Sequence, residues 1–496
     1  MNLNEEILQN TLDRIQIPEK SIGTVIASMD GYIIIEGLYD VYMGEKVIIN
    51  NSSYGLVFDI LEDRVIIFTI EKNIIAIGST VTRTKELYSI DVSENMTGRI
   101  FNVLGNCIDG KVFEKINIKK MFIEREIPNI TEREPINTPL ETGFLLIDSL
   151  IPIGRGQRQL LIGNQNTGKT YTSINSFIRN KKDNNAIFIY VAISQQEAKT
   201  ARVVEYLRIN ETLEKTIVIS TNTGEPALNH YLAPYVGCAI AEYFAHELKK
   251  DVIIVYDDLS NQAIAYRELC LLMRRAPSRE AYPGDIFYLH ARLLERAGNF
   301  KNRGSITALP IAQLQEDDSS AYIPTNLISI TDGQIIFDTK LFNKGIKPAI
   351  NTELSVSRVG SAAQYESISK ISKSLRLELA QYHELDLFSQ FTNDLDEETI
   401  KKLEKGKLLI SLLKQDLVKN YDSCQKYIIL YLFKYHDTLI IKIKDCESFL
   451  YWLFDFFKYT YVPLYEKLST GKLLNTEELK EFNDFIVNIF SLYENI

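Results

Sequence analysis

The sequence has few cysteines, and they form no recognisable arrangement. Its five cysteines are scattered along 496 residues, and no Cys-x-x-Cys pair occurs among them. A disulfide framework or a zinc site needs paired or closely spaced cysteines, so we expect neither. The pattern is typical of reduced thiols in an intracellular protein.

The chain also lacks a long apolar run and an excess of basic residues. Its most apolar run, Phe449–Phe454, is much shorter than the roughly 20 apolar residues that a membrane span needs. The N-terminus begins Met1-Asn2-Leu3-Asn4-Glu5-Glu6 and resembles neither a secretory signal nor a transit peptide. Because 55 basic residues face 65 acidic ones, no electrostatic attraction to nucleic acid is expected. We expect no nucleic-acid partner and no direct membrane insertion.

Sequence patterns predict an α/β protein of several domains. Short β runs separated by turns predict a small β-barrel over 22–95, after an N-terminal helix and linker over 1–21. Alternating strands and helices over 96–366 predict a mainly parallel sheet with helices on both faces. Helical periodicity with almost no glycine predicts a C-terminal helical bundle over 367–496. The expected central strands are Ala186–Ala192, Thr216–Ser220, Val252–Tyr256, Ser305–Pro310 and Leu327–Ser329.

One motif dominates the central region. Residues 163–170 fit the phosphate-loop pattern G-x-x-x-x-G-K-[ST], between an apolar strand at 158–162 and a helix at 171–179. Glycines let backbone N–H groups surround a phosphate at a helix N-terminus. Lys169 is expected to reach the outer phosphates, and Thr170 to coordinate Mg²⁺. The predicted ligand is therefore ATP or ADP with Mg²⁺. The predicted loop residues are Gly163, Asn164, Gln165, Asn166, Thr167, Gly168, Lys169 and Thr170, followed by Tyr171.

Two further strands end in polar residues that bear on catalysis. Val252–Tyr256 delivers Asp257 to the edge of the sheet where ligands bind, so Asp257 is expected to hold Mg²⁺ through water, opposite Thr170. ATP hydrolysis needs a group that polarises the attacking water, usually a carboxylate. The edge of the strand that begins near Ile187 offers Gln195 and Gln196 instead, with Glu197 following, and an amide cannot accept a proton at neutral pH. We therefore expect this site to bind nucleotide and to turn it over poorly or not at all.

Arg358 closes the central region and has two interpretations from sequence alone. A guanidinium is suited to the charge that spreads over a transferring phosphoryl group. A structural salt bridge explains an arginine at this position equally well.

Several segments together resemble the alpha subunit of the F-type (rotary) ATP synthase. The resemblance covers Ile22 to about Gln415, is densest from Pro152 to Gly360, and fades past Gln415. It implies a β-barrel crown, a RecA-like nucleotide domain and a helical C-terminal domain. The matching segments are 152–158, the phosphate loop, 231–235, 256–260, 279–285, 322–326, 330–334 and 355–360.

The resemblance also implies partners. Alpha and beta-type subunits alternate in a hexameric ring around a gamma-type shaft, on the inner face of the cell membrane and without insertion into it. A stator subunit is a further expected partner, although the N-terminal segment differs from the usual one. The predicted location is therefore cytoplasmic and peripheral to the membrane.

The resemblance assigns roles to particular residues. Gln195 falls where the beta subunit has its catalytic Glu, and Arg358 falls at the arginine finger that reaches the neighbouring beta site. Lys347, Pro348 and Gln415 are expected near the nucleotide. The chain departs from the family in having Asn164-Gln165-Asn166 where Asp-Arg-Gln is usual, Lys347 where Arg is usual, and Leu417 in place of a second glutamine. The loss of two loop charges predicts weaker nucleotide retention.

Three alternatives remain open at this point. The first is a homohexameric motor of the helicase or secretion type, which would need a catalytic carboxylate in the chain's own site. The second is a divergent alpha-like subunit, of the kind found as extra copies in some wall-less bacteria, in a motor used for a task such as motility. The third is a non-enzymatic, nucleotide-stabilised scaffold whose ring partner has lost activity.

Overall fold

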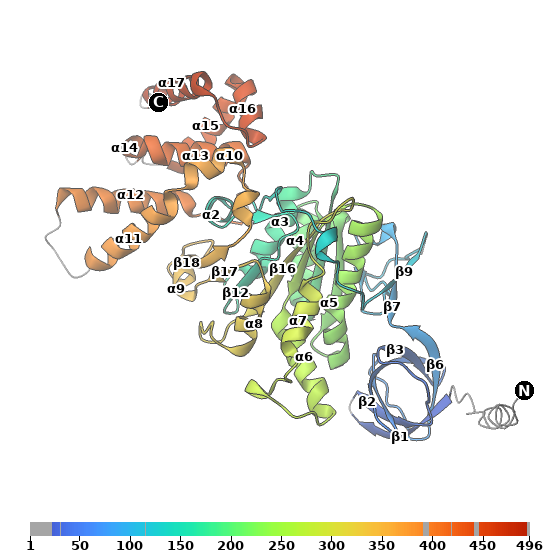
Figure 1. Cartoon of the computed structure of the whole chain (residues 1–496). Coiled ribbons are helices and arrows are strands. Elements are labelled where there is room, and N and C mark those ends of the chain that lie inside the picture. The colour runs from blue at the N-terminus through green and yellow to red at the C-terminus, as the bar shows by residue number, and fades with distance from the viewer. Residues whose placement is uncertain are drawn as a thin grey trace, which may run out of the picture.

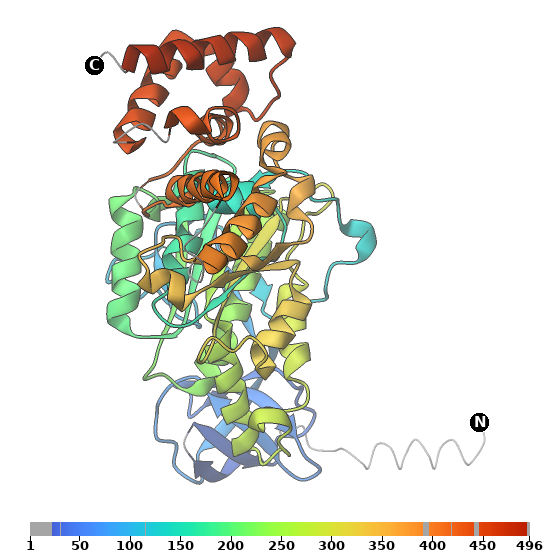
Figure 2. The same cartoon turned by 90° about the vertical axis from the view of Figure 1, so that its left-hand side faces the viewer.

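The computed structural model describes residues 22–29, 31–114, 116–389, 396–417, 419–440 and 446–493. The expected N-terminal helix and linker therefore lie outside the described residues. A β-barrel and a helical region lie at opposite ends of the molecule, with the nucleotide-binding region between them (Figures 1 and 2).

The first region is a closed six-stranded barrel, as expected. Side chains alternate along each strand, so that Val25, Ile35, Val47 and Ile67 fill the interior at 1% exposure or less. In sheet order the strands are β1 (Ile22–Met29), β2 (Tyr32–Glu36), β5 (Val65–Thr69), β4 (Ser53–Ile60), β3 (Glu45–Ile49) and β6 (Thr80–Leu87).

The central region contains an eight-stranded sheet in which every pair is parallel except β17 with β18. The prediction of a mainly parallel sheet is confirmed. Two small antiparallel pairs accompany it, β7 (Ser89–Val92) with β9 (Lys119–Phe122) and β10 (Pro139–Leu140) with β11 (Ile153–Gly154). In order the sheet is β18 (Ile350–Ser357), β17 (Gly333–Phe337), β12 (Leu160–Gly163), β16 (Ile306–Gln313), β15 (Asp251–Asp257), β13 (Ala186–Gln195), β14 (Thr216–Asn222) and β8 (Ile100–Phe101).

Helices cover both faces of this sheet, so its strands are apolar on both sides. Helices α2 (Leu145–Leu150), α3 (Lys169–Asn180) and α4 (Glu197–Ile209) share one core with the C-terminal helices. Helices α5 (Ala227–Glu242), α6 (Leu259–Leu272), α7 (Ile286–Leu294) and α8 (Tyr322–Ile330) share the core of the opposite face.

One expected strand was wrong. Leu327–Ser329 belongs to helix α8, and the strand that enters the sheet is β17, which follows the turn at Asp332. A run of three residues is shorter than one helical turn, so it has no periodicity that distinguishes a strand from a helix. Helix α9 (Thr339–Asn343) follows β17 and precedes the edge strand β18.

The remaining chain is helical, which confirms the predicted bundle. Phe449, Leu453 and Phe457 are fully buried in helix α15, as expected for a bundle core. None of the helices within the described ranges is both long and apolar enough to cross a membrane. The C-terminal helices are α10 (Glu366–Ser372), α11 (Leu375–Ser389), α12 (Glu397–Leu413), α13 (Ser423–Tyr435), α14 (Asp437–Ile440), α15 (Cys446–Thr460), α16 (Val462–Ser469) and α17 (Thr476–Tyr493).

Candidate nucleotide site and an exposed arginine

The phosphate loop joins β12 to α3 at the carboxyl edge of the sheet. Gly168, at the N-cap of α3, has φ of 99°, which an L-residue rarely adopts. The amino group of Lys169 turns back on the loop and donates to the carbonyl oxygens of Gly163, at 2.6 Å, and of Asn164. Burial lowers the pKa of Lys169 to about 8. The loop therefore holds a buried cation against its own carbonyls, at the point where phosphates are expected.

Thr170 and Asp257 meet as the sequence predicts. The Thr170 hydroxyl donates to Asp257 Oδ2 at 2.7 Å, and the buried Tyr190 hydroxyl donates to the same oxygen at 2.9 Å. Burial next to this carboxylate raises the pKa of Tyr190, so it remains a donor. A hydroxyl and a carboxylate are oxygen ligands of the kind that Mg²⁺ prefers, directly or through water. The pair fits the expected metal position.

Gln195 lies beside this pair and is fully engaged. Its amide nitrogen donates to the backbone carbonyl of Asp257 at 3.1 Å, and its oxygen accepts from Lys199 at 2.8 Å. The next carboxylate, Asp258, caps α6 by accepting from the Asn261 N–H at 2.8 Å. Burial and the neighbouring Asp257 raise the pKa of Asp258 to about 6. The end of β13 therefore presents the amide of Gln195, and the carboxylates of Asp257 and Asp258 already accept hydrogen bonds from other residues.

The remaining residues of the expected nucleotide site are spread around the loop. Tyr171 packs edge-on against Tyr206, with ring centroids 5.2 Å apart. The carbonyl of Lys347, which precedes Pro348, accepts from the Gln415 N–H at 2.7 Å. The Gln415 side chain is buried and binds backbone instead of facing solvent, since it accepts from Leu145 N–H at 2.9 Å and donates to Gly143 at 2.6 Å. Gln415 therefore joins the helical region to the start of the nucleotide region.

Arg358 lies at the opposite end of the sheet from the phosphate loop. Gly163 pairs with Phe337, at the end of β17. The Arg358 N–H instead donates to the carbonyl of Asp332, which precedes Phe337 by five residues, just before β17 begins. At about 3.3 Å per residue, the two levels are about 16 Å apart along the strands. Two strand positions also separate them across the sheet. The guanidinium therefore cannot reach its own phosphate loop.

The Arg358 side chain is exposed but its backbone is held firmly. The guanidinium donates to the Thr331 carbonyl at 3.1 Å, and within the described ranges no carboxylate forms an ion pair with it. Ser357 donates to the Pro152 carbonyl at 2.6 Å and accepts from the Gly360 N–H at 3.2 Å. A Cβ on Gly360 would lie 1.7 Å from the Pro152 oxygen, so only glycine fits there. This geometry contradicts the alternative of a structural salt bridge.

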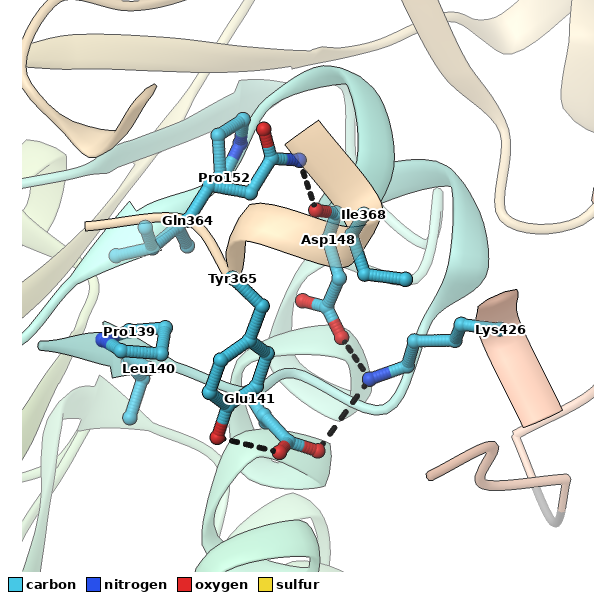
Figure 3. Close-up of a pocket in the computed structure, with 10 residues that line it drawn as sticks. Pro139, Leu140, Glu141, Asp148, Pro152, Gln364, Tyr365, Ile368 and Lys426 are labelled. Atoms are coloured by element: carbon cyan, nitrogen blue, oxygen red, sulfur yellow. Dashed lines mark hydrogen bonds and ion pairs between the residues drawn. The ribbon is translucent and has the colours of Figure 1, made fainter. Parts of the chain in front are cut away.

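Sequence reasoning missed a cluster of charges that joins the phosphate-loop helix to the helical region; Figure 3 shows its members Glu141, Asp148 and Lys426. Lys426 of α13, 3% exposed, pairs with Asp148 of α2 at 2.6 Å and with Glu141 at 3.4 Å. Glu141 also pairs with Arg179 in the last turn of α3, at 2.5 Å, and accepts from the Tyr365 hydroxyl at 3.1 Å. No motif marks these residues, because Glu141 lies 38 residues from Arg179 and more than 200 from Tyr365 and Lys426.

The fold and this site define a class: a P-loop nucleotide-binding protein with a β-barrel before its sheet domain and a helical domain after it. The family description "ATP synthase alpha/beta family, nucleotide-binding domain" matches residues 143–357. The description "ATP synthase alpha/beta chain, C terminal domain" matches residues 364–489. The match past residue 415 shows that our expectation of a fading resemblance there was wrong.

Similar proteins point to one branch of this family. The chain is 42% identical over 494 residues to "ATP synthase subunit alpha, sodium ion specific" of Acetobacterium woodii, covering 98% of each chain. It is 43% identical over 473 residues to "ATP synthase subunit alpha" of Clostridium botulinum, covering 94% of this chain and 93% of the relative. The chain therefore belongs to the ATP synthase alpha/beta family, as a nucleotide-binding alpha subunit of the F-type (rotary) enzymes.

Proposed function

We propose that this subunit binds ATP or ADP with Mg²⁺ without hydrolysing it, and that Arg358 completes the catalytic site of a neighbouring beta-type subunit. One observation carries the proposal: the phosphate loop and Arg358 lie at opposite ends of one sheet, about 16 Å apart along the strands. A single chain cannot bring the two together, whereas adjacent subunits of an alternating ring can.

The proposal that the chain's own site is non-catalytic is supported by the bonding of Gln195. Its oxygen already accepts from Lys199, and its nitrogen donates to Asp257, so it has no means of taking a proton from water. Mg²⁺ would be held by Thr170 and Asp257, and bound Mg²⁺ would neutralise phosphate charge. Lys169 would turn from the loop carbonyls to the phosphates, and the backbone N–H groups of the loop would bind them.

Two features of Arg358 support its proposed role in the neighbouring site: its guanidinium is exposed, and its backbone is held in place by contacts of the adjacent residues. The guanidinium carries a permanent charge, and within the described ranges no carboxylate neutralises it. The contacts of Ser357 and Gly360 with Pro152 hold its backbone in one position. A preorganised cation of this kind stabilises the charge of phosphoryl transfer without rearrangement. The implied partners are beta-type subunits in a hexameric ring and a gamma-type shaft, peripheral to the inner face of the membrane.

Two measurements test the proposal. The purified chain should bind Mg-ATP yet show no appreciable turnover, and robust hydrolysis by the lone chain would favour a homohexameric motor. In the assembled complex, Arg358→Ala should lower kcat at least about 100-fold while the subunits still assemble. Arg208→Ala, which removes an exposed arginine that pairs with Glu205, serves as the control and should leave kcat within about twofold. A near-normal rate for Arg358→Ala would refute the proposed role.

A further inference from the structure

The first variable residue of the phosphate loop, Asn164, does not face the space that the loop surrounds. Its amide nitrogen donates to the Thr339 hydroxyl at 3.0 Å, and its oxygen accepts from the Asp317 N–H at 3.1 Å. The Thr339 hydroxyl in turn donates to the Asp317 carboxylate at 3.0 Å. The three residues, which we call the Asn164 anchor, form a closed cycle of hydrogen bonds between the loop, the segment before α8 and the start of α9.

Each hydrogen bond of the cycle needs one donor and one acceptor, and Asn164, Thr339 and Asp317 supply matching ones. Thr339 has one proton, which it gives to Asp317, and it accepts from Asn164. With Asp at position 164, two carboxylates would compete for that single proton and would repel each other. An amide at 164 and a carboxylate at 317 are therefore a matched pair.

The anchor also holds the backbone of residues 316–317 in an unfavourable conformation. Glu316 and Asp317 have φ of 53° and 59°, in the left-handed region that side-chain-bearing residues rarely adopt. Next to them, the Leu314 N–H donates to the Gly163 carbonyl at 3.0 Å, which is one of the two carbonyls that receive Lys169. The segment 314–317 is thus tied to the first two residues of the phosphate loop, and the anchor maintains the strained part.

We propose that Asn164, Asp317 and Thr339 are positioning residues, which fix the start of the phosphate loop in the conformation that receives nucleotide phosphates. This inference rests on the nucleotide-binding function proposed above and names the residues that set the affinity of that site. Asn164 and Asp317 act as a pair, so that changing Asn164 alone to Asp weakens Mg-nucleotide binding and exchanging both residues restores it. The exchange reverses the direction of the cycle: Asn at 317 donates to Thr339, which donates to Asp at 164.

The experiment is a double-mutant cycle on the full-length chain, with a fluorescent Mg-ATP analogue as the probe. Asn164→Asp should raise Kd about tenfold, the scale of one or two lost hydrogen bonds. Asp317→Asn should remain within about threefold of the original chain, because its amide oxygen still accepts from Thr339. The double exchange should also return to within about threefold, and Thr339→Val should abolish this rescue. Asp318→Asn is the matched control, because that carboxylate accepts hydrogen bonds from the backbone and hydroxyl of Ser320 and takes no part in the anchor.

Hydrogen exchange of the chain without nucleotide separates this inference from the proposed function. The Asp317 amide, which the anchor protects directly, should exchange faster in Asn164→Asp and regain protection in the double exchange. Equal Kd values for Asn164→Asp and the original chain, or a double exchange no better than Asn164→Asp, would overturn the anchor. A chain that binds no nucleotide but shows the expected exchange pattern would refute the proposed function and would overturn the role in affinity, leaving only a structural cycle.

Discussion

The cluster around Glu141 gives a prediction whose size follows from the structure. Glu141 lies between Arg179, in the last turn of the phosphate-loop helix α3, and Lys426 of α13 in the helical region. It also accepts from Tyr365 and Ser423, both at 3.1 Å. Glu141→Gln preserves the shape and the capacity to accept these hydrogen bonds but removes the charge. We expect it to weaken the attachment of the helical region to the nucleotide region.

The magnitude comes from the pKa of this carboxyl group. Burial alone would raise it, but Lys426 and Arg179 outweigh that cost and hold the pKa of Glu141 at about 2, against 4.5 in an unperturbed glutamate. A difference of about 2.5 pKa units corresponds to about 3 kcal/mol of folding stability. Because the folded pKa is lowered, this stability is present above pH 4.5 and is lost as the pH falls towards 2. Lys426 keeps Asp148 as a partner at 2.6 Å, so the loss should not greatly exceed this value.

Trp452, the only tryptophan of the chain, lies in α15 and reports on the helical region by fluorescence. With a slope of about 1–3 kcal/mol per molar urea, Glu141→Gln should lower the urea midpoint at pH 7 by about 1–3 M. At pH 3 the difference in unfolding free energy should shrink to about 1 kcal/mol. Glu404→Gln, which changes an exposed glutamate of α12, is the control and should leave the midpoint unchanged. Identical midpoints at pH 7, or a difference that persists undiminished at pH 3, would refute this reasoning.

Two further predictions concern the nucleotide site and Arg358. Gly360→Ala should lower the ATPase kcat of the assembled complex by at least about tenfold without changing Mg-ATP binding by this chain, because the added Cβ meets the Pro152 oxygen and displaces the Arg358 backbone. Gly284→Ala, where a Cβ meets nothing within 4 Å, is the matched control. Equal rates for both variants would contradict the role of Gly360 in holding the Arg358 backbone. Because burial lowers the pKa of Lys169 to about 8, affinity for Mg-ATP should fall about tenfold between pH 7 and pH 9, as the ammonium loses its proton. Lys169→Arg should flatten this profile in the same binding titration, and a flat profile in the unaltered chain would show that the lysine stays charged.

Local patterns were sufficient to predict the architecture and the centre of the site. The phosphate loop, the strand ending in Asp257 and the strand ending in Gln195 each carry their signal within about ten residues, and parallel strands bring such ends together at one edge. The barrel and the helical bundle could also be predicted, because side chains alternate with a period of two residues in strands and about 3.6 in helices. Leu327–Ser329 was misread because a short apolar run has no period that separates helix from strand.

Contacts between distant positions were beyond prediction from one sequence. Glu141 and Lys426 are 285 residues apart, and Asn164 and Thr339 are 175 apart. Only the fold brings such polar residues together, and nothing in their neighbours along the chain distinguishes them from solvated surface. The assignments of Lys347, Pro348 and Gln415 to nucleotide binding, and the use of the motor for a task other than ATP synthesis, stay predictions.

Under the proposed function, the two ends of the central sheet account for the need for a partner subunit. At one end, the Lys169 amino group, Thr170 and Asp257 supply what holds nucleotide, but the position for activating water presents the engaged amide of Gln195. At the other end, Arg358 presents a charge with no phosphate within reach. Restoring a carboxylate at 195 alone would therefore leave the chain's own site without a finger, since no conformational change within an intact sheet moves Arg358 the required distance. The proposed sharing of catalysis between neighbouring subunits follows from this arrangement.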